Sequence, residues 1–513
     1  MVNEGDKVLI NGTEYTLGSR LPGGIGAEGQ IFNVEGWPNY VIKIINDSKM
    51  TRFQRNETYN HLKWLYSIGS RSESLKKVLT VPRALLDDHL GYIMRKAVDF
   101  EAIKKYTKVP EDMNDFDDWF KNRYTLKKRY QIIINMFRAL RELHINGLVF
   151  TDLSPNNIMV DKTRNRIVFI DTDNVRNRMD PYLGVLGTDG YIAPEVRRKP
   201  NVELAEKNNI DPKILSNCGR ITPESDVFSA AVIAFELLTL QHPFVGDIVE
   251  EGEAELEEAA LNIETDYILK EGTENISTRN LVPQFKSLVT PEIAKLFYRT
   301  FVDGKLDPSL RPDDIEFQEA FENALDKIVE CPDCGYSKIY SFDNHNECIN
   351  CGRNLGPKIV LVMYNVFAQL NRADLINSIG DYPDLNIDIE NLKDENGKEP
   401  LNFEEISRIV LEPGENNTKY LYLRHFEKTN ERQEVYAKVT LSEVKTLKIE
   451  IAKNYFENAY LVERPNMQRN AMEKHIPLGK GKEGIQFDKY GIVFETKKQG
   501  TGFIKIFCKF IEC

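Results

Sequence analysis

The chain has 513 residues, 41% hydrophobic and 28% charged, which is enough to bury several cores and too many for one ordinary domain. Its formal net charge of −12 excludes a general affinity for nucleic acid or an anionic membrane, since both require a cationic surface. The charged start Met1–Ile10 and the lack of an apolar run of roughly 18 residues predict a cytoplasmic protein.

The first hundred residues alternate short β-like runs with one helical stretch near Asn56–Ser67. Alternating apolar residues indicate strands, and the longer periodicity indicates a helix beside them. The expected strands are Tyr15–Leu17, Ile31–Val34, Tyr40–Ile45 and Leu86–Met94. This region is therefore expected to form a small sheet with one helix.

From Tyr124 to Leu325 the pattern becomes mainly helical. Periodic apolar faces occur in Tyr130–His144 and Val227–Leu240, and the loops are rich in Asp, Asn, Pro and Gly. The acidic stretch Val249–Ala259 is typical of a solvated helix or loop, so we assign no function to it.

Gly24, Gly26 and Gly29 form a G-x-G-x-x-G pattern between two expected strands. Without side chains, such residues let backbone N–H groups approach a phosphate, although the pattern alone is equally typical of a flexible hairpin. Lys43 follows on the strand Tyr-Val-Ile-Lys. A lysine there can extend from a sheet edge into solvent, but its position after the glycines favours a phosphate ligand.

The segment Phe150–Asn157 reads Phe-Thr-Asp-Leu-Ser-Pro-Asn-Asn and follows an amphipathic helix. Asp152 and Asn157 are spaced so that one group can accept a hydroxyl proton while the other reaches a metal ion. Asp171 ends the apolar run Ile167–Ile170. A carboxylate at that place can meet the same metal, or it can simply form a turn.

In this order, these residues resemble the eukaryotic-type (Hanks-type) serine/threonine protein kinases, in a bacterial-like form. Gly187–Glu195 matches the end of the activation segment of that family. Asp226–Ser229 resembles the buried helix that supports the catalytic loop, and Arg311 resembles the arginine that pairs with Glu195. The resemblance covers about residues 10–326 and implies the bilobal α+β kinase fold.

The resemblance also implies a role for each site residue. Lys43 would hold the α- and β-phosphates of ATP, paired to Glu57 unless that glutamate faces solvent. Asp152 would orient the substrate hydroxyl and accept its proton, while Asn157 and Asp171 would bind magnesium. The residues expected around adenine, which would equally suit an ordinary core, are Ile31, Val41 and Met159, with Met94–Val98 as the hinge.

Several positions depart from the family pattern. Phe150 and Thr151 stand where the family usually has His and Arg, which argues against activation by loop phosphorylation. Ser154 replaces a lysine that stabilises the γ-phosphate, so another cation would have to substitute. Asp171-Thr-Asp173 replaces Asp-Phe-Gly, and the register favours Asp171 over Asp173 as the metal ligand. The cations considered as substitutes are Arg176, Arg178 and Lys162.

Four of the seven cysteines form a C-x2-C-x13-C-x2-C pattern, with a glycine after each pair. Cys331, Cys334, Cys348 and Cys351 at this spacing predict a closed, structural zinc site, with a redox dithiol pair as the alternative. Clustered cysteines of this kind are typical of metal binding in a reducing compartment rather than of a disulfide framework. The cations nearby are too few to favour nucleic acid.

After the cysteines, alternating segments separated by polar turns predict an all-β, sandwich-like domain, used in targeting or oligomerisation. Its expected strands are Lys358–Val366, Tyr420–His425, Val435–Val439, Lys448–Ile451 and Phe503–Phe510. A kinase followed by a zinc ribbon resembles some bacterial stress-response kinases that act with a phosphatase and a von Willebrand-type partner protein. The expected domains are the kinase N-lobe (1–98), the C-lobe (99–327), the four-cysteine zinc ribbon (328–356) and the β-rich domain (357–513).

Three functions are compatible with these features. The intact Lys43, Asp152, Asn157 and Asp171 favour an ATP- and Mg-dependent kinase acting on Ser or Thr of a protein. The alternative is a pseudokinase, an ATP-binding scaffold that recruits partners through the ribbon and the tail, and the departures in the catalytic loop motivate it. A small-molecule kinase would share the acid and amide of the catalytic loop but would lack a motif like Gly187–Glu195.

Overall fold

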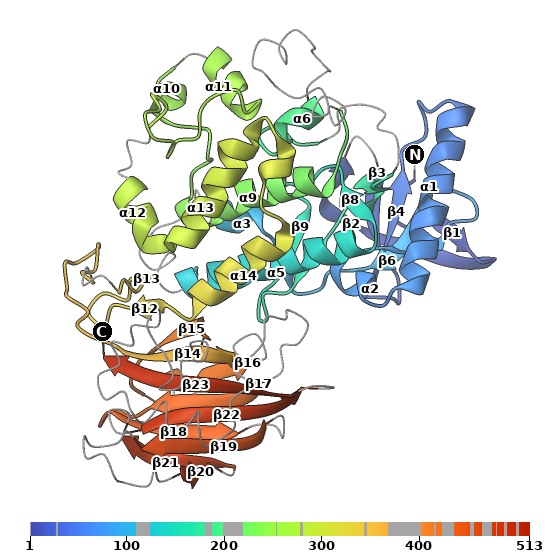
Figure 1. Cartoon of the computed structure of the whole chain (residues 1–513). Helices are drawn as coiled ribbons and strands as arrows, with labels where there is room; N and C mark the ends of the chain where they lie inside the picture. Colours follow the sequence, from blue (N-terminus) through green and yellow to red (C-terminus); the bar gives the residue numbers. More distant parts are fainter. Residues whose placement is uncertain are drawn as a thin grey trace. The chain divides into compact units, whose positions relative to one another are not determined.

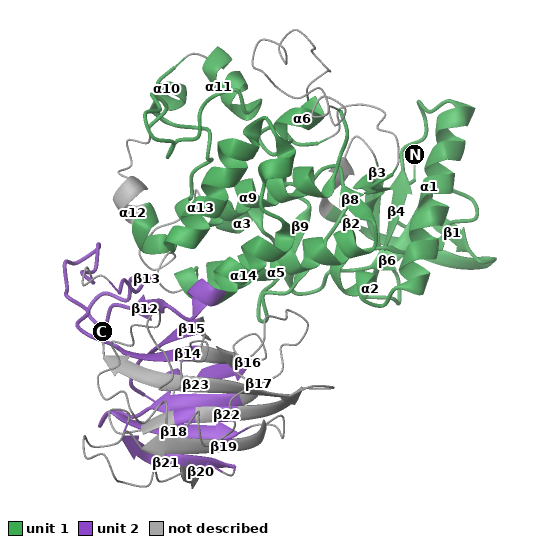
Figure 2. Cartoon of the chain, in the orientation of Figure 1, with its two compact units in different colours: residues 1–322 green, residues 323–513 purple. Residues whose placement is uncertain are grey.

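The computed structural model describes residues 2–26, 29–108, 124–179, 187–197, 219–252, 254–276, 281–342, 346–367, 402–414, 417–422, 435–451, 456–463, 475–478, 480–486, 490–498 and 502–512. The chain divides into two compact units, Met1–Glu322 and Asn323–Cys513 (Figure 2). Among the helices of the described residues, none is long and apolar enough to cross a membrane.

The first unit begins with a six-stranded antiparallel sheet in the order β1-β2-β3-β4-β6-β5 (Figure 1). Its strands are β1 (Lys7–Ile10), β2 (Thr13–Gly26), β3 (Gly29–Val34), β4 (Tyr40–Ile45), β5 (Pro82–Leu85) and β6 (Gly91–Arg95). One face of the sheet buries an apolar cluster that includes Phe32, Ile42, Ile44 and Ile93. Because side chains alternate across a strand, the intervening residues of β4 and β6 project from the other face.

The expected strand Leu86–Met94 is wrong in its first half. Residues 86–90 form a turn between β5 and β6, and only the second half is extended. The turn is held by two aspartates, since Asp87 accepts a hydrogen bond from the amide of Gly12 and Asp88 accepts one from the amide of Leu9. These carboxylates bind backbone amides at and just after β1, so residues 86–90 turn instead of extending the strand.

Helix α1 (Arg52–Arg71) follows β4 and packs beside β5. Thr51 and Gln54 form a capping box, which satisfies backbone N–H groups that the first helical turn leaves unpaired. Gly69 lies against Val81 so closely that an added Cβ would meet the valine side chain at 2.6 Å. The short helix α2 (Leu75–Val78) completes the small lobe.

The second lobe of this unit is mainly helical, as expected. Its largest buried element is α9, which is apolar on all sides, begins with a proline after the N-cap Thr222 and packs against α5. The helices and 3-10 turns are α3 (Lys104–Thr107), α5 (Leu126–Ile145), η2 (Thr172–Asn174), α6 (Pro194–Arg197), α9 (Pro223–Thr239), α10 (Asp247–Glu250), α11 (Ala254–Leu261), α12 (Leu281–Leu288), α13 (Pro291–Phe301), η3 (Asp303–Lys305), η4 (Pro308–Leu310) and α14 (Asp314–Leu325). Short strands are β7 (Phe100–Ala102), β8 (Leu148–Phe150), β9 (Ile158–Asp161), β10 (Ile167–Phe169) and β11 (Val175–Asn177).

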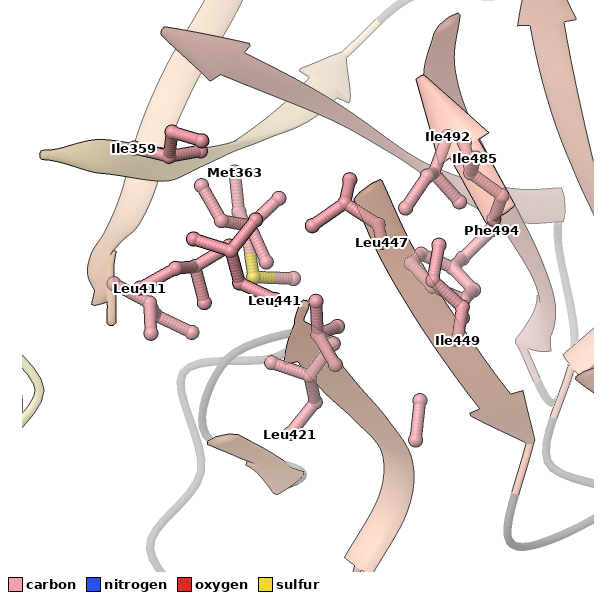
Figure 3. Packing of buried hydrophobic residues seen from close by; sticks show 14 of the residues in the cluster. Ile359, Met363, Leu411, Leu421, Leu441, Leu447, Ile449, Ile485, Ile492 and Phe494 are labelled. Atoms are coloured by element: carbon pink, nitrogen blue, oxygen red, sulfur yellow. The ribbon is translucent and has the colours of Figure 1, made fainter. Parts of the chain in front are cut away.

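The second unit contains two antiparallel sheets that share one apolar core, which confirms the expected sandwich-like β domain (Figure 3). Leu361 and Met363 enter this core from one sheet, and Val439 and Ile449 enter it from the other. The first sheet, in spatial order, contains β15 (Asn402–Leu411), β14 (Ile359–Phe367), β23 (Gly502–Glu512), β22 (Tyr490–Lys498), β19 (Phe456–Glu463) and β20 (His475–Pro477). The second contains β16 (Lys419–Tyr422), β17 (Val435–Leu441), β18 (Thr446–Ile451) and β21 (Gly481–Gln486).

The cysteine segment packs on the first of these two sheets, on the face that points away from the shared core. It carries the hairpin β12 (Ile328–Glu330) and β13 (Ser337–Ile339), and its Val329 and Tyr340 share a second apolar cluster with Val360, Val362 and Val410. Successive residues of β14 thus enter two different cores, because side chains alternate across the strand. The ribbon and the β domain therefore form a single packed unit.

Candidate active site

The outward face of the small-lobe sheet gathers the residues expected to contact a nucleotide. Ile31 on β3 lies directly opposite Lys43 on β4, and Val41 lies directly opposite Met94 on β6. Directly opposed residues of antiparallel strands project to the same face. This face is the one that the apolar cluster does not use. Met159, the remaining adenine candidate, lies on β9 of the helical lobe and is half-buried.

Two carboxylates that follow β10 hold the ammonium group of Lys43. The lysine forms an ion pair with Asp171 and a second with Asp173, whose Oδ2 lies 2.6 Å from Nζ. Burial by itself would lower the pKa of Lys43, but the charges of Asp173 and then Asp171 outweigh it and raise the pKa above its usual value. Lys43 therefore carries its charge throughout the physiological pH range.

Asp152 is bound from two sides. The side-chain amide of Asn157 donates to its Oδ2 at 2.8 Å, and the hydroxyl of Thr188 donates to its Oδ1 at 2.7 Å. Thr188 belongs to the segment Gly187–Glu195, which the sequence singled out separately. The carboxylate can therefore accept a hydrogen from an aliphatic hydroxyl, which is the geometry a general base requires.

Asn174, which sequence reasoning missed, joins these two groups of residues. Its side-chain amide donates to Asp171 Oδ2 at 3.2 Å, and its backbone carbonyl accepts from the amide of Thr151 at 2.8 Å. The hydroxyl of Thr151 also reaches the Asn174 side chain, at 3.4 Å. Thr151, where the family usually has arginine, thus serves to connect the catalytic loop to the segment that carries Asp171.

The glycine pattern lies where β2 meets β3. Gly24 and Gly26 are at the end of β2, and Gly26 pairs with Gly29 at the start of β3. Residues 27–28 between them are outside the described part of the chain. Gly29 has a packing reason of its own, because a Cβ at this position would lie 2.5 Å from the carbonyl oxygen of Ile44. Only glycine permits this approach of the two backbones.

The family model of the protein kinase domain matches residues 22–300 of this chain. The chain belongs to the protein kinase family. It is 29% identical over 129 residues to the serine/threonine-protein kinase PknB of Mycobacterium tuberculosis, a stretch that covers 24% of this chain and 17% of that protein. Probable serine/threonine-protein kinase PknB of Bifidobacterium longum is 27% identical over 165 residues, or 31% of this chain and 20% of that protein. Serine/threonine-protein kinase nekl-2 of Caenorhabditis elegans is 25% identical over 218 residues, a stretch that covers 40% of this chain and 51% of that protein.

Two buried polar clusters support the catalytic loop of this kinase domain. Asp226, at the start of α9, accepts a hydrogen bond from the amide of Phe150 at 2.9 Å and another from His144 at 3.1 Å. Arg311 binds Glu195 through two hydrogen bonds of 2.7 Å, with the arginine side chain fully buried. The bidentate pair fixes the end of the segment that presents Thr188.

Protein kinases use ATP with magnesium, and the donor set of this site fits both. Asp171 offers a carboxylate, and Asn157 turns its amide nitrogen to Asp152, so that its amide oxygen is the atom available to a cation. Such oxygen donors suit magnesium. Lys43 would contact the phosphates from the outward face of the small-lobe sheet.

The structure does not bring Glu57 to Lys43. The glutamate is exposed on α1, and no ion pair joins it to Lys43 in the described part of the chain. The α1 residue that reaches the site is His61, whose Nε2 lies 2.6 Å from the guanidinium of Arg176. Sequence reasoning missed this contact because His61 matches no family motif.

Three cations were considered as substitutes for the lysine that Ser154 replaces. Arg176 is bound to His61 and to the carbonyl of Asp173, whereas Lys162 and Arg178 are exposed, and their substitution for the lysine stays a prediction. Ser154 itself is fully buried, and its hydroxyl has no hydrogen-bond partner among the described residues.

The four cysteines meet in one cluster, a geometry that favours a shared metal. All four sulfurs lie within 4.8 Å of one another. The 3.6 Å contacts join Cys331 to Cys351 and Cys334 to Cys348, which belong to different Cys-x-x-Cys pairs. Thiolates bound tetrahedrally to zinc at about 2.3 Å would lie about 3.8 Å apart. Contacts between the pairs match one central ion better than two separate dithiols.

Proposed function

We propose that the kinase domain transfers the γ-phosphate of ATP, with magnesium, to serine or threonine of a protein substrate. The observation that carries this proposal is the pair of hydrogen bonds on Asp152, from Asn157 on one side and the Thr188 hydroxyl on the other. The bacterial relatives are named as a serine/threonine-protein kinase and a probable serine/threonine-protein kinase, and the matched stretches cover a fifth or less of their length. The catalytic loop can thus present a base to an aliphatic hydroxyl.

Each residue has a distinct task in the proposed reaction. Asp152 orients the substrate hydroxyl and accepts its proton as the oxygen attacks the γ-phosphorus. Lys43 holds the other phosphates, and Asp171 and Asn157 would hold the metal. Bound magnesium would neutralise negative charge on the transferring group. The remaining contribution is positioning, because phosphoryl transfer requires no covalent bond to the protein.

We also propose that the cysteine cluster holds a structural zinc ion and that the chain acts in the cytoplasm. Four protein thiolates fill a tetrahedral shell, so the metal would organise the second unit rather than catalyse. A reducing compartment keeps these thiolates available. Recruitment through the β domain, and the phosphatase and von Willebrand-type partners, stay predictions from the domain order.

The test is transfer of the γ-phosphate to the chain itself and to a generic basic protein. Wild type is compared with Asp152→Asn and Asp171→Asn, which keep the side-chain size, and with Asp303→Ala, which removes an exposed carboxylate of the same lobe. We expect the two site variants to lose about 10²-fold or more in rate and the control to match wild type. Phosphate mapped to serine or threonine completes the assignment.

The comparisons give the pseudokinase alternative no support. The phosphate-transfer assay also distinguishes an active kinase from a pseudokinase. A wild-type chain that binds ATP and transfers no phosphate, even with manganese and at high protein concentration, would overturn the kinase proposal. Equal transfer by wild type and Asp152→Asn would overturn the role of Asp152 alone.

A further inference from the structure

Helix α1 offers no carboxylate to Lys43. Its single acidic residue is Glu57, which is exposed. One helical turn later, His61 contacts Arg176, and burial followed by the charge of Arg176 lowers the pKa of His61 to about 4. The residue that α1 presents at the site is thus a neutral imidazole, which cannot neutralise a lysine.

Asp173 occupies the place of the missing counter-ion. One of its oxygens lies 2.6 Å from Lys43 Nζ, and the other accepts a hydrogen bond of 2.8 Å from the hydroxyl of Tyr92. Tyr92 is fully buried and is the cross-strand partner of Lys43 on β6. The carboxylate is therefore held by two adjacent residues of the same sheet face.

Asp171 also pairs with Lys43, but its situation differs. The Asp171 side chain is 31% exposed and that of Asp173 is 17% exposed. Each aspartate has both oxygens engaged within the chain, since Asn174 donates a hydrogen bond to Asp171 Oδ2. Asp171 is the more exposed of the two and is the carboxylate assigned to magnesium. Asp173 has no such second task, so it is the aspartate left to hold Lys43.

We propose that Asp173 is the positioning residue of Lys43, taking the part that the family resemblance assigns to a glutamate of the helix. This inference rests on the proposed function, since the position of Lys43 affects the reaction only if Lys43 holds the phosphates of ATP. Asp173 lies in η2, two residues after Asp171, so one short segment carries both the lysine anchor and the metal carboxylate. Lys43 is consequently held in place without an ion pair to α1.

The first test measures the accessibility of Lys43 in the full chain without nucleotide. Acetylation by N-hydroxysuccinimide acetate at pH 8, followed by peptide mass spectrometry, reports release of the amine from its carboxylates. We expect Asp173→Asn to speed acetylation of Lys43 by about tenfold, because an opposite charge in contact favours the protonated amine. Glu57→Gln, and the matched control Glu35→Gln, should keep the wild-type rate.

Tyr92→Phe keeps the charges and removes one hydrogen bond from Asp173, so a smaller acceleration is expected. It also decides the question if Asp173→Asn fails to fold, since an unchanged rate in Tyr92→Phe would then overturn the proposal. With both variants folded, a wild-type rate in Asp173→Asn, or an equal acceleration in Glu57→Gln, overturns it.

Kinetics with ATP separate this inference from the proposed function. A misplaced Lys43 should lower kcat by about 10²-fold and change KM for ATP much less, because positioning acts on the transferring geometry. If wild type and Asp173→Asn transfer phosphate at the same rate, the inference about Asp173 is refuted and the proposed kinase activity stands. If wild type transfers no phosphate but Asp173→Asn still speeds acetylation of Lys43, the proposed catalysis is refuted and Asp173 remains the partner of Lys43.

Discussion

Loss of the zinc ion proposed for the cysteine cluster should loosen the first sheet of the β domain. The change is Cys351→Ser, since Cys351 is the exposed cysteine of the cluster and its replacement disturbs packing least. Cys218→Ser, which changes a cysteine outside the two Cys-x-x-Cys pairs of the sequence, is the control. The ribbon shares its apolar cluster with three valines of the sheet, so losing the metal removes the cover of their face.

The expected size follows from burial. Val360, Val362 and Val410 are each 0% exposed. Covering a valine contributes about 1.5–3 kcal/mol, so uncovering all three would remove up to roughly 4–9 kcal/mol of local stability, an upper bound because a loosened ribbon still covers part of the face. At about 1.4 kcal/mol per factor of ten, this upper bound corresponds to an acceleration of amide exchange in β14 and β15 of at most roughly 10³- to 10⁶-fold.

The assay is hydrogen exchange of the full chain by mass spectrometry, with metal content measured on the same samples. Wild type and Cys218→Ser should contain one zinc ion per chain, and Cys351→Ser should contain none. The amides of α9 in the first unit serve as an internal reference. If the metal is absent and exchange in β14 is unchanged, the ribbon does not stabilise the sheet, and the reasoning from the shared core is refuted.

Three further outcomes are expected. Arg311→Ala should destabilise the kinase unit by about 3–5 kcal/mol in urea unfolding, because it leaves the Glu195 carboxylate buried and unpaired, whereas Arg311→Met with Glu195→Leu should lose less. His144 donates hydrogen bonds to the buried carboxylates of Asp226 and Asp314, and these bonds outweigh burial and raise the pKa of His144 from 6.5 to about 9. Its contribution to stability is therefore complete below about pH 6.5 and is lost as the pH rises through 9. The difference in unfolding free energy between wild type and His144→Gln should therefore shrink over that range; a constant difference would contradict it. Gly29→Ala should lower the melting temperature because its Cβ would lie 2.5 Å from a β4 carbonyl, and Gly18→Ala, with its nearest contact at 3.5 Å, should not.

Spacing along the chain was sufficient for the features whose parts are close in sequence. The Cys-x-x-Cys pairs predicted the cysteine cluster, and the segment Phe150–Asn157 predicted an acid and an amide that do meet. The strand expected at Lys358–Val366 corresponds to β14, but its apolar residues do not alternate with polar ones as expected, because both faces of the strand are buried. Short segments have few backbone conformations, so their residue order determines much of their geometry.

The partner of Lys43 was decided by the tertiary structure alone. The resemblance pointed to Glu57 on α1, but Glu57 and His61 are one turn apart, roughly 6 Å along the helix axis, and periodicity does not say which turn reaches the sheet. Asp173 comes from a segment distant in sequence and meets Lys43 only where the two lobes pack together. A helix supplies several equivalent turns, and the choice among them depends on contacts that no local pattern records.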